Sequence, residues 1–248
     1  MRLRTILLFV SPLIFSLSAR AQQKDQFIRT IQTVKQAVVA VVCVQNKPDG
    51  TTGLASIEGT GFFVSTDETF ITAGHVAHGL YLAAPPRQAI CETAAIYVPN
   101  TGWQAGVNIS LTWFKIDMCK FDDDLDLAKC GTVENPFTSN RIKVKPSTVA
   151  FDISTQQEGI EIGFTGFPLS TAQPITARGT IGTYWGLPSE ASPREIVIDH
   201  SNWPGASGSP VYLSNGKVIG LVLKRGINDA AGFAFARTSK FIEDFLSK

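Results

Sequence analysis

The chain has 248 residues, a formal net charge of +1, a hydrophobic fraction of 44% and an aromatic fraction of 10%. This length is sufficient for one large or two small domains with a sizeable core, and the composition excludes an intrinsically disordered or low-complexity chain. The near-zero charge argues against a general nucleic-acid-binding protein, and no apolar run reaches the roughly 18 residues that a membrane span requires.

The first residues are typical of a secretory signal peptide. Two arginines precede the apolar stretch Thr5–Leu17, and the small residues Ala19 and Ala21 follow it at the spacing of a cleavage site. We predict cleavage after Ala21, so that residues 1–21 are the signal and residues 22–248 are the mature chain, secreted or periplasmic and without a stable membrane anchor. The alternative is a segment that is retained as an N-terminal anchor.

The mature chain begins with a helical pattern and then changes to a strand pattern. Phe27, Ile31 and Val34 stand at helical spacing among polar residues, which predicts an amphipathic helix over residues 22–36. From Ala37 onward, short runs rich in β-branched residues alternate with turn sequences. The predicted strands are Ala37–Val44, Gly61–Ser65, Ala94–Val98, Ile109–Phe114, Asp126–Ala128, Ile160–Thr165, Thr180–Tyr184, Glu195–Asp199, Pro210–Leu213, Val218–Leu223 and Gly232–Ala236.

The end of the chain returns to a helical pattern. Phe241, Ile242 and Phe245 would share one side of a short closing helix over Thr238–Leu246. About a dozen short strands favour an all-β barrel or sandwich architecture. No linker divides residues 22–248, so we predict one unit, with any crossover between two barrels near residues 131–148.

The four cysteines form an even set, which in an exported protein predicts disulfides. Four cysteines allow three pairings. We prefer Cys119–Cys130, which would bracket a short acidic turn, together with Cys43–Cys91. The alternative is reduced, buried cysteines that act as small hydrophobic residues. Their spacing is unlike that of a zinc site, and we expect neither a metal nor an organic cofactor.

Three short segments combine the residue types that nucleophilic acyl transfer requires. They are Thr72–Val76, Asp126–Ala128 and Pro204–Pro210. A serine hydroxyl such as that of Ser207 becomes a useful nucleophile when an imidazole accepts its proton, and a carboxylate must orient that imidazole. Glycines around the serine allow backbone N–H groups to converge on a developing oxyanion. His75, Asp126 and Ser207 therefore predict a catalytic triad, and their order is that of the chymotrypsin class.

With these segments in place, the chain resembles a trypsin-like serine protease of the chymotrypsin fold. The resemblance is closest to the bacterial HtrA-type and glutamyl-endopeptidase-type branches, and it extends over nearly the whole mature chain. The further segments that carry it are Val34–Val39, Gly59–Val64, Ile162–Phe164, Thr176–Ile181, Val218–Leu221 and Gly232–Phe235. It implies two six-stranded antiparallel β-barrels, here with an N-terminal helix and a short C-terminal helix, and polypeptide substrates.

The resemblance also implies a role for each site residue. Ser207 would be the nucleophile, His75 the general base and Asp126 the orienting carboxylate. The backbone N–H groups of Gly205 and Ser207 would form the oxyanion hole. The sequence specifies no oligomeric state.

Several other residues compete for these roles. His78 and His200 are the other histidines. We expect His78 to be structural or at the surface, and His200 either lines the pocket or caps a strand. Asp124 is the reserve for the triad carboxylate, and Ser209 is the rival nucleophile. Trp203 is either a substrate-facing aromatic residue or a packing residue.

The chain departs from the family pattern in two respects. Ala206 replaces the acidic residue that precedes the nucleophile in digestive proteases, so activation by a new N-terminal amine is not expected. The chain also stops shortly after Phe235, so we expect no PDZ domain and no peptide-triggered control of the HtrA type.

The residues expected around the substrate side chain carry little charge. Ser201 stands where trypsin-like enzymes have an aspartate, and Val222, Phe233 and Phe235 would line an apolar slot. The prediction is an endopeptidase that prefers small or medium apolar P1 residues. Lys224 keeps a glutamyl-specific enzyme as an alternative.

Two further alternatives belong to other functional classes. One is a catalytically inactive peptide-binding module on a protease fold. The other is an esterase, which is disfavoured because the segment after Ser207 has a strand pattern, whereas the G-x-S-x-G elbow requires a helix.

Overall fold

The computed structural model describes residues 26–81, 91–104, 110–226 and 231–248. The described strands form two closed antiparallel barrels of six strands each, which confirms the predicted fold class. The first barrel contains β1 (Val38–Asn46), β2 (Thr52–Phe63), β3 (Phe70–Ala73), β4 (Thr93–Pro99), β5 (Leu111–Asp122) and β6 (Leu127–Thr132). The second contains β7 (Glu161–Gly166), β8 (Ile175–Trp185), β9 (Glu195–Asp199), β10 (Pro210–Tyr212), β11 (Val218–Arg225) and β12 (Phe233–Thr238).

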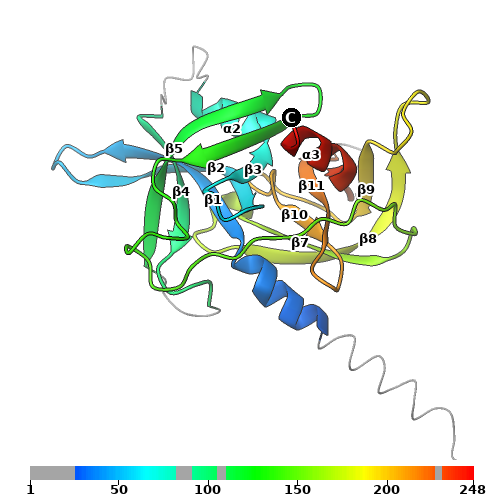
Figure 1. Cartoon of the computed structure of the whole chain (residues 1–248), viewed down its shortest axis with the longest axis horizontal. Helices are drawn as coiled ribbons and strands as arrows, with labels where there is room; N and C mark the ends of the chain where they lie inside the picture. The colour runs from blue at the N-terminus through cyan, green and yellow to red at the C-terminus, as the bar shows by residue number, and fades with distance from the viewer. Residues whose placement is uncertain (1–25, 82–90, 105–109, 227–230) are drawn as a thin grey trace, which may run out of the picture.

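The two barrels lie side by side, with β1–β6 on the left and β7–β12 on the right of Figure 1. The strand order is β1-β2-β3-β6-β5-β4 in the first barrel and β10-β11-β12-β9-β8-β7 in the second. The chain passes from one barrel to the other between Thr132 and Glu161. Part of this connection pairs with β11, because Phe151 forms a parallel bridge with Val218.

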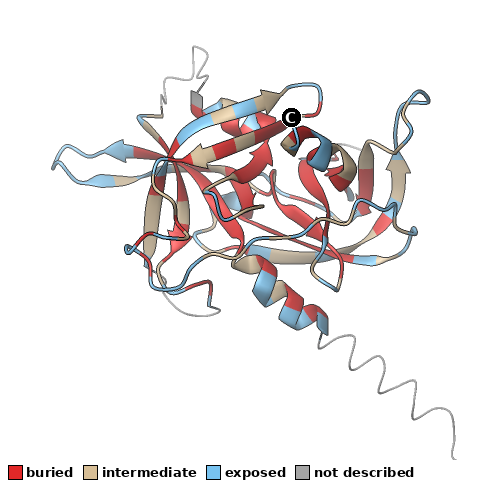
Figure 2. Ribbon diagram, viewed as in Figure 1, coloured by how far each residue is buried: buried red, intermediate tan, exposed pale blue. Residues whose placement is uncertain are grey.

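The strands form where β-branched and aromatic residues can be buried. The first seven residues of β1, Val38–Val44, are all buried, and Phe62, Phe63 and Phe70 fill the same barrel with no exposed surface. Burying one such side chain stabilises the fold by about 1.5–3 kcal/mol relative to an exposed position. Figure 2 shows the buried residues concentrated inside the barrels and the exposed ones at the end of the β1–β2 hairpin.

Several elements differ from the sequence prediction. Strand β3 was not predicted, β5 continues to Asp122 beyond the predicted end at Phe114, and β8 begins at Ile175 before the predicted start at Thr180. Strand β2 begins at Thr52 and not at Gly61, because its first half is an exposed hairpin arm without the expected apolar run. Asp126 was assigned to a strand, but it has a φ of +54° and lies just before β6. The left-handed conformation takes this residue out of the extended backbone that a strand requires.

Three helices accompany the barrels in the described chain. The N-terminal helix covers residues 26–35, α2 covers Gly74–Tyr81 and α3 covers Ser239–Leu246. Buried Ile242 and Phe245 fix α3, as their helical spacing predicted. The expected signal segment, residues 1–21, lies outside the described residues. Within the described part of the chain, no helix is long and apolar enough to cross a membrane.

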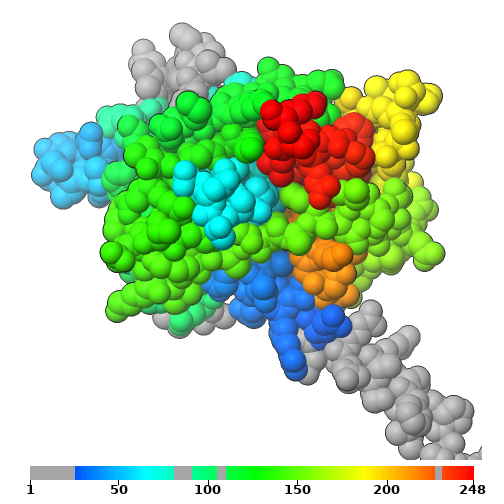
Figure 3. Space-filling model, in the orientation of Figure 1, coloured from blue at the N-terminus to red at the C-terminus, as the bar shows by residue number. Residues whose placement is uncertain are grey.

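Each terminal helix contacts the barrel that the other half of the chain forms. The Thr30 hydroxyl donates a hydrogen bond to the Ser214 carbonyl (2.6 Å), so the N-terminal helix lies against the β10–β11 turn of the second barrel. Figure 3 shows this contact as blue beside orange. At the other end, the Lys129 ammonium of β6 approaches the Leu246 carbonyl of α3 (3.5 Å).

Two disulfides join elements of the first barrel. Cys43 of β1 pairs with Cys91, with a Cα–Cα distance of 5.3 Å, and Cys119 of β5 pairs with Cys130 of β6 at 4.1 Å. These are the pairs that the sequence favoured. Disulfides persist in oxidising compartments, so they are consistent with a protein that functions outside the cytoplasm.

Candidate active site

His75 and Asp126 meet where β3 ends and β6 begins. These strands pair antiparallel, with Ala73 opposite Leu127. His75 follows the end of β3 and Asp126 precedes the start of β6, so this pairing brings the two residues together. The His75 Nδ1 atom lies 2.8 Å from Asp126 Oδ2, and the His75 backbone N–H donates to Asp126 Oδ1 at 2.8 Å. A third bond runs from the Gly74 N–H to the Asp126 carbonyl (2.9 Å). The carboxylate thereby fixes both the ring and the backbone of the histidine.

The environment keeps Asp126 ionised. Partial burial alone would raise the pKa of Asp126, but hydrogen bonds from His75 and the charges of His75 and Arg237 outweigh it, so the pKa lies below its ordinary value. The imidazole remains accessible, since half of the His75 side-chain surface is exposed. A charged carboxylate behind an accessible imidazole can stabilise the imidazolium that forms when His75 accepts a proton.

Arg237 approaches the carboxylate from behind. Its side chain is only 4% exposed, and its Nε donates to the carbonyl of Leu125, the residue before Asp126, at 2.9 Å.

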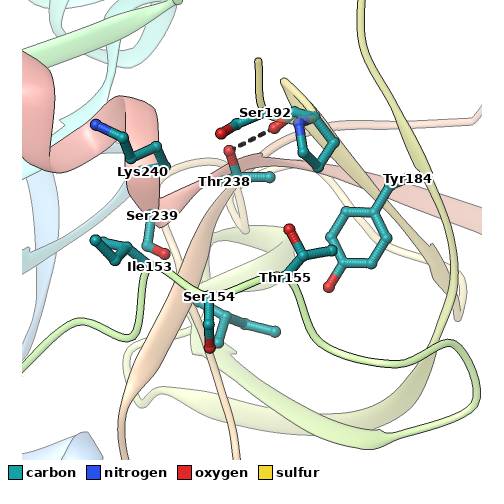
Figure 4. Close-up of a pocket in the computed structure, with 10 residues that line it drawn as sticks. Ile153, Ser154, Thr155, Tyr184, Ser192, Thr238, Ser239 and Lys240 are labelled. Carbon is teal, nitrogen blue, oxygen red and sulfur yellow. Dashed lines mark hydrogen bonds between the residues drawn. The ribbon is translucent and has the colours of Figure 1, made fainter.

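The next residue, Thr238, donates its hydroxyl proton to the Pro193 carbonyl (2.8 Å) at the edge of a small cavity of about 10 Å³ (Figure 4). This cavity has room for about one water molecule and is not a ligand site.

Ser207 belongs to the loop that precedes β10. Its hydroxyl donates to the Leu223 carbonyl at 2.8 Å, and no hydrogen bond joins it to His75 among the described residues. The histidine helix and the Ser207 loop both lie next to Gly59. A Cβ atom placed on Gly59 would lie 2.6 Å from the Val76 side chain and 3.0 Å from the Ser207 carbonyl. The structure therefore brings His75 and Asp126 into contact and places Ser207 across Gly59 from the histidine helix.

In each peptide unit from Pro204 to Gly208, the carbonyl oxygen accepts a hydrogen bond. The Pro204 carbonyl accepts from the Leu169 N–H (2.7 Å), and the Ala206 carbonyl accepts from the Ser209 N–H (3.0 Å). The carbonyls of Gly205 and Ser207 accept from the hydroxyl (2.8 Å) and the N–H (2.9 Å) of Thr60.

The same pattern leaves two donors unused. Within the described chain, no acceptor takes the N–H of Gly205 or the N–H of Ser207. These are the two groups expected to bind an oxyanion. The carbonyls around them are already bonded, so both N–H groups are free to serve as donors to a ligand.

Two glycines make this loop conformation possible. Gly205 has a φ of +93° and Gly208 a φ of +89°, in the left-handed region that disfavours other residues. A Cβ atom on Gly205 would lie 2.3 Å from the Phe167 carbonyl oxygen, and one on Gly208 would lie 1.8 Å from the Thr60 carbonyl oxygen. A side chain at either position would displace the backbone around Ser207.

The residues expected to contact the substrate side chain lie in different surroundings. Val222 is fully buried in the core of the second barrel, whereas Phe233 is 38% exposed. Phe235 is buried against Trp185, with ring centroids 5.2 Å apart, and the Lys224 ammonium lies 5.4 Å from its ring. The exposed Ser201 hydroxyl donates to the Ala231 carbonyl (3.1 Å).

The competing residues have structural partners. His78 stacks on Phe121 at 4.1 Å, and its Nε2 pairs with Asp123 at 2.8 Å. Asp124 accepts a hydrogen bond from Arg194 (2.9 Å).

The remaining rivals lie in the second barrel. His200 packs edge-on against Phe164 at 5.4 Å, and its Nδ1 contacts the Ser201 carbonyl. The rival nucleophile Ser209 is completely buried, with a hydroxyl that has no partner in the described chain, and Trp203 is 43% exposed.

Sequence reasoning missed two residues of this site, Thr60 and Arg237. Thr60 stands between two glycines in the buried end of β2, and Arg237 is the only charged residue of β12. An isolated polar residue in a buried strand must find a partner, which was the available signal. The identity of those partners lies far away in the sequence.

Comparison with known proteins agrees with this geometry. The model of the trypsin-like peptidase domain matches residues 59–221. The chain belongs to this family. It is accordingly a serine endopeptidase that hydrolyses peptide bonds. No curated protein matches the chain, and a PDZ domain is not found among the described residues.

Solved structures with the same fold include two proteases. The active form of the Rv3671c protease from M. tuberculosis has 20% sequence identity and a TM-score of 0.61, covering 88% of this chain and 83% of its own. Deg5 has 17% identity and a TM-score of 0.65, covering 90% and 93%. At this identity the similarity establishes the fold alone.

Proposed function

We propose that the protein is an exported serine endopeptidase that acts through His75, Asp126 and Ser207 and a covalent acyl-enzyme. The observation that carries this proposal is the combination of the His75–Asp126 pair with two unused N–H groups beside Ser207. The pair can accept and stabilise a proton, and the N–H groups can stabilise the negative charge that develops on the substrate carbonyl.

The reaction follows from these groups. The Ser207 hydroxyl leaves the Leu223 carbonyl by side-chain rotation and attacks the peptide carbonyl carbon, while its proton passes to His75 Nε2. The oxyanion is held by the N–H groups of Gly205 and Ser207. The intermediate then breaks the C–N bond, and the leaving amine takes the proton from His75. A water molecule then attacks the acyl carbon and passes a proton to His75. The bond to Ser207 breaks, the serine oxygen takes this proton, and the acid is released.

A covalent probe tests the triad. A fluorophosphonate should label the folded protein, and labelling should disappear in Ser207→Ala and fall strongly in His75→Ala. Ser209→Ala is the matched control, because its hydroxyl is buried and has no partner in the described chain, so it should be labelled like the parent. Labelling of Ser207→Ala would refute the proposed nucleophile.

One observation favours a second candidate, a peptide-binding module without turnover. The Ser207 hydroxyl is bonded to Leu223 and not to His75, which is the arrangement that an inactive protein would keep. Absence of labelling in the parent protein, together with tight binding of peptides from a library, would support this candidate over the protease.

Specificity and export complete the proposal. We propose small or medium apolar P1 residues, because the Lys224 ammonium is already engaged, 3.5 Å from Glu195, and lies over the Phe235 ring. Profiling with peptides that differ only in alanine, valine, leucine or glutamate at P1 tests this.

The two disulfides support export. N-terminal sequencing of the mature protein should give a sequence that begins at Gln22.

A further inference from the structure

Thr60 is a first-barrel residue whose hydrogen bonds lead to the loop of Ser207. It lies in β2 with no exposed surface. Its hydroxyl donates to the Gly205 carbonyl at 2.8 Å and accepts from the Phe167 N–H at 3.0 Å. Its backbone N–H donates to the Ser207 carbonyl at 2.9 Å. The hydroxyl and the backbone N–H of Thr60 thus contact the second barrel at the two ends of the Gly205–Ser207 segment.

These contacts hold the peptides that neighbour those of the two unused N–H groups. Because a peptide unit is planar, fixing its carbonyl also fixes the direction of its N–H. The Ser207 N–H belongs to the Ala206–Ser207 peptide, and Thr60 anchors the peptide on each side of it. The Gly205 N–H belongs to the Pro204–Gly205 peptide, whose carbonyl accepts from the Leu169 N–H. Thr60 anchors the next peptide along the chain, through the Gly205 carbonyl.

The Thr60 hydroxyl also holds the backbone that supports this loop. Phe167 precedes the short helical turn η1 (Pro168–Ser170), in which Leu169 and Ser170 have φ values of +56° and +55°. Such conformations are strained for residues other than glycine and persist only where neighbouring contacts enforce them. The Leu169 N–H is the donor that holds the Pro204 carbonyl, so the strained turn and the Ser207 loop share Thr60 as their anchor.

We propose that Thr60 is a positioning residue for the oxyanion hole, a clamp from the first barrel that keeps both N–H groups directed at the reacting carbonyl. The inference rests on the proposed function and adds to it the residue that connects the barrel of His75 to the loop of Ser207. Thr60 does not touch the substrate. It acts through the carbonyls of Gly205 and Ser207.

Three variants separate positioning from stability. Thr60→Val keeps the shape but removes the hydroxyl, and Thr60→Ser restores the hydroxyl. Thr165→Val is the matched control, because Thr165 is equally buried and its hydroxyl bonds Tyr212 and Thr176, both at 2.8 Å, in the second barrel. Urea unfolding and steady-state hydrolysis of one peptide substrate are measured for all three.

Thr60→Val should lower kcat about 10- to 100-fold, a smaller decrease than complete loss of one oxyanion donor would cause. KM should change less than about 3-fold. Thr60→Ser should stay within about 3-fold of the parent in kcat. Thr165→Val should lose stability and keep its kcat. Peptide binding measured in the Ser207→Ala background should be the same with and without Thr60→Val, because the effect belongs to the transition state.

A Thr60→Val protein that loses stability as Thr165→Val does and keeps its kcat overturns the inference, since Thr60 would then be structural only. If Thr60→Val does not fold, Thr60→Cys replaces it, because a thiol fills the site but donates weakly. Equal kcat in the Cys and Ser variants would also overturn the inference. Turnover by Ser207→Ala would refute the proposed function itself, whereas an inactive Ser207→Ala beside a fully active Thr60→Val would refute this inference alone.

Discussion

Replacing Gly205 with alanine measures how strictly the oxyanion loop depends on its backbone. Gly205 and Gly159 both have left-handed backbones, with φ values of +93° and +81°. A Cβ atom on Gly159 would meet nothing within 4 Å, whereas one on Gly205 would lie 2.3 Å from the backbone carbonyl oxygen of Phe167. Gly159→Ala therefore isolates the cost of the backbone conformation, and Gly205→Ala adds a contact that only backbone movement can relieve.

The two variants should differ in activity more than in stability. The left-handed conformation costs alanine about 1–2 kcal/mol in each protein. Relief of the contact in Gly205→Ala should also displace the Gly205 N–H, and loss of one oxyanion donor costs about 10²–10³ in kcat. Gly159→Ala should keep the parent kcat.

The assay combines urea unfolding with steady-state kinetics on one peptide substrate. We expect Gly205→Ala to remain folded and to lose at least about 10²-fold in kcat, which corresponds to about 2.7 kcal/mol. A Gly205→Ala protein with kcat within about 3-fold of the Gly159→Ala protein would refute the assignment of this N–H to the oxyanion hole.

Three further predictions concern the rest of the fold. Burial raises the pKa of Tyr212 to about 12, so about 2–3 kcal/mol of stability should be present below pH 10 and lost as the pH rises through about 12, and Tyr212→Phe should remove this alkaline step in urea titrations. Arg237→Met should lower the free energy of unfolding by about 1.5–3 kcal/mol at pH 7, as expected for a charged hydrogen bond, and Arg237→Lys by less. The part of that loss that depends on ionised Asp126 should be fully present above about pH 4 and should disappear as the pH falls further, through the lowered pKa of the folded protein. Replacing both cysteines of Cys43–Cys91, which are 48 residues apart, should cost about 4 kcal/mol by loop entropy, measured by unfolding of the oxidised protein and the variant.

The sequence predicted the elements whose burial follows a local pattern. The run from Val38 to Val44 is β-branched and apolar, and it forms β1 of the first barrel as expected. The helix of Ile242 and Phe245 also follows from local spacing. The exposed first half of β2 was missed, because its pairing with β1 and not its composition makes it a strand.

The candidate site divides in the same way. His75, Asp126 and Ser207 stand in short motifs that can be recognised one at a time, and the register of β3 and β6 then brings the first two together. The Thr60 hydroxyl acts on Gly205, which is 145 residues further along the chain, so no local pattern connects the two. The orientation of the Ser207 hydroxyl toward Leu223 depends on tertiary packing for the same reason.

The contacts of the two terminal helices determine what each half of the chain would lack if the protein were cut between its barrels. The N-terminal helix starts the half of the chain that builds the first barrel, yet Thr30 is bonded to Ser214 in the second. The C-terminal helix ends the second half, yet its Leu246 carbonyl meets Lys129 in the first. If the chain is cut between Thr132 and Glu161, each fragment carries the terminal helix that contacts the barrel of the other fragment. Reassembly of the two fragments should therefore require both helices. A circularly permuted chain in which either helix is separated from its own half of the sequence should reassemble more slowly.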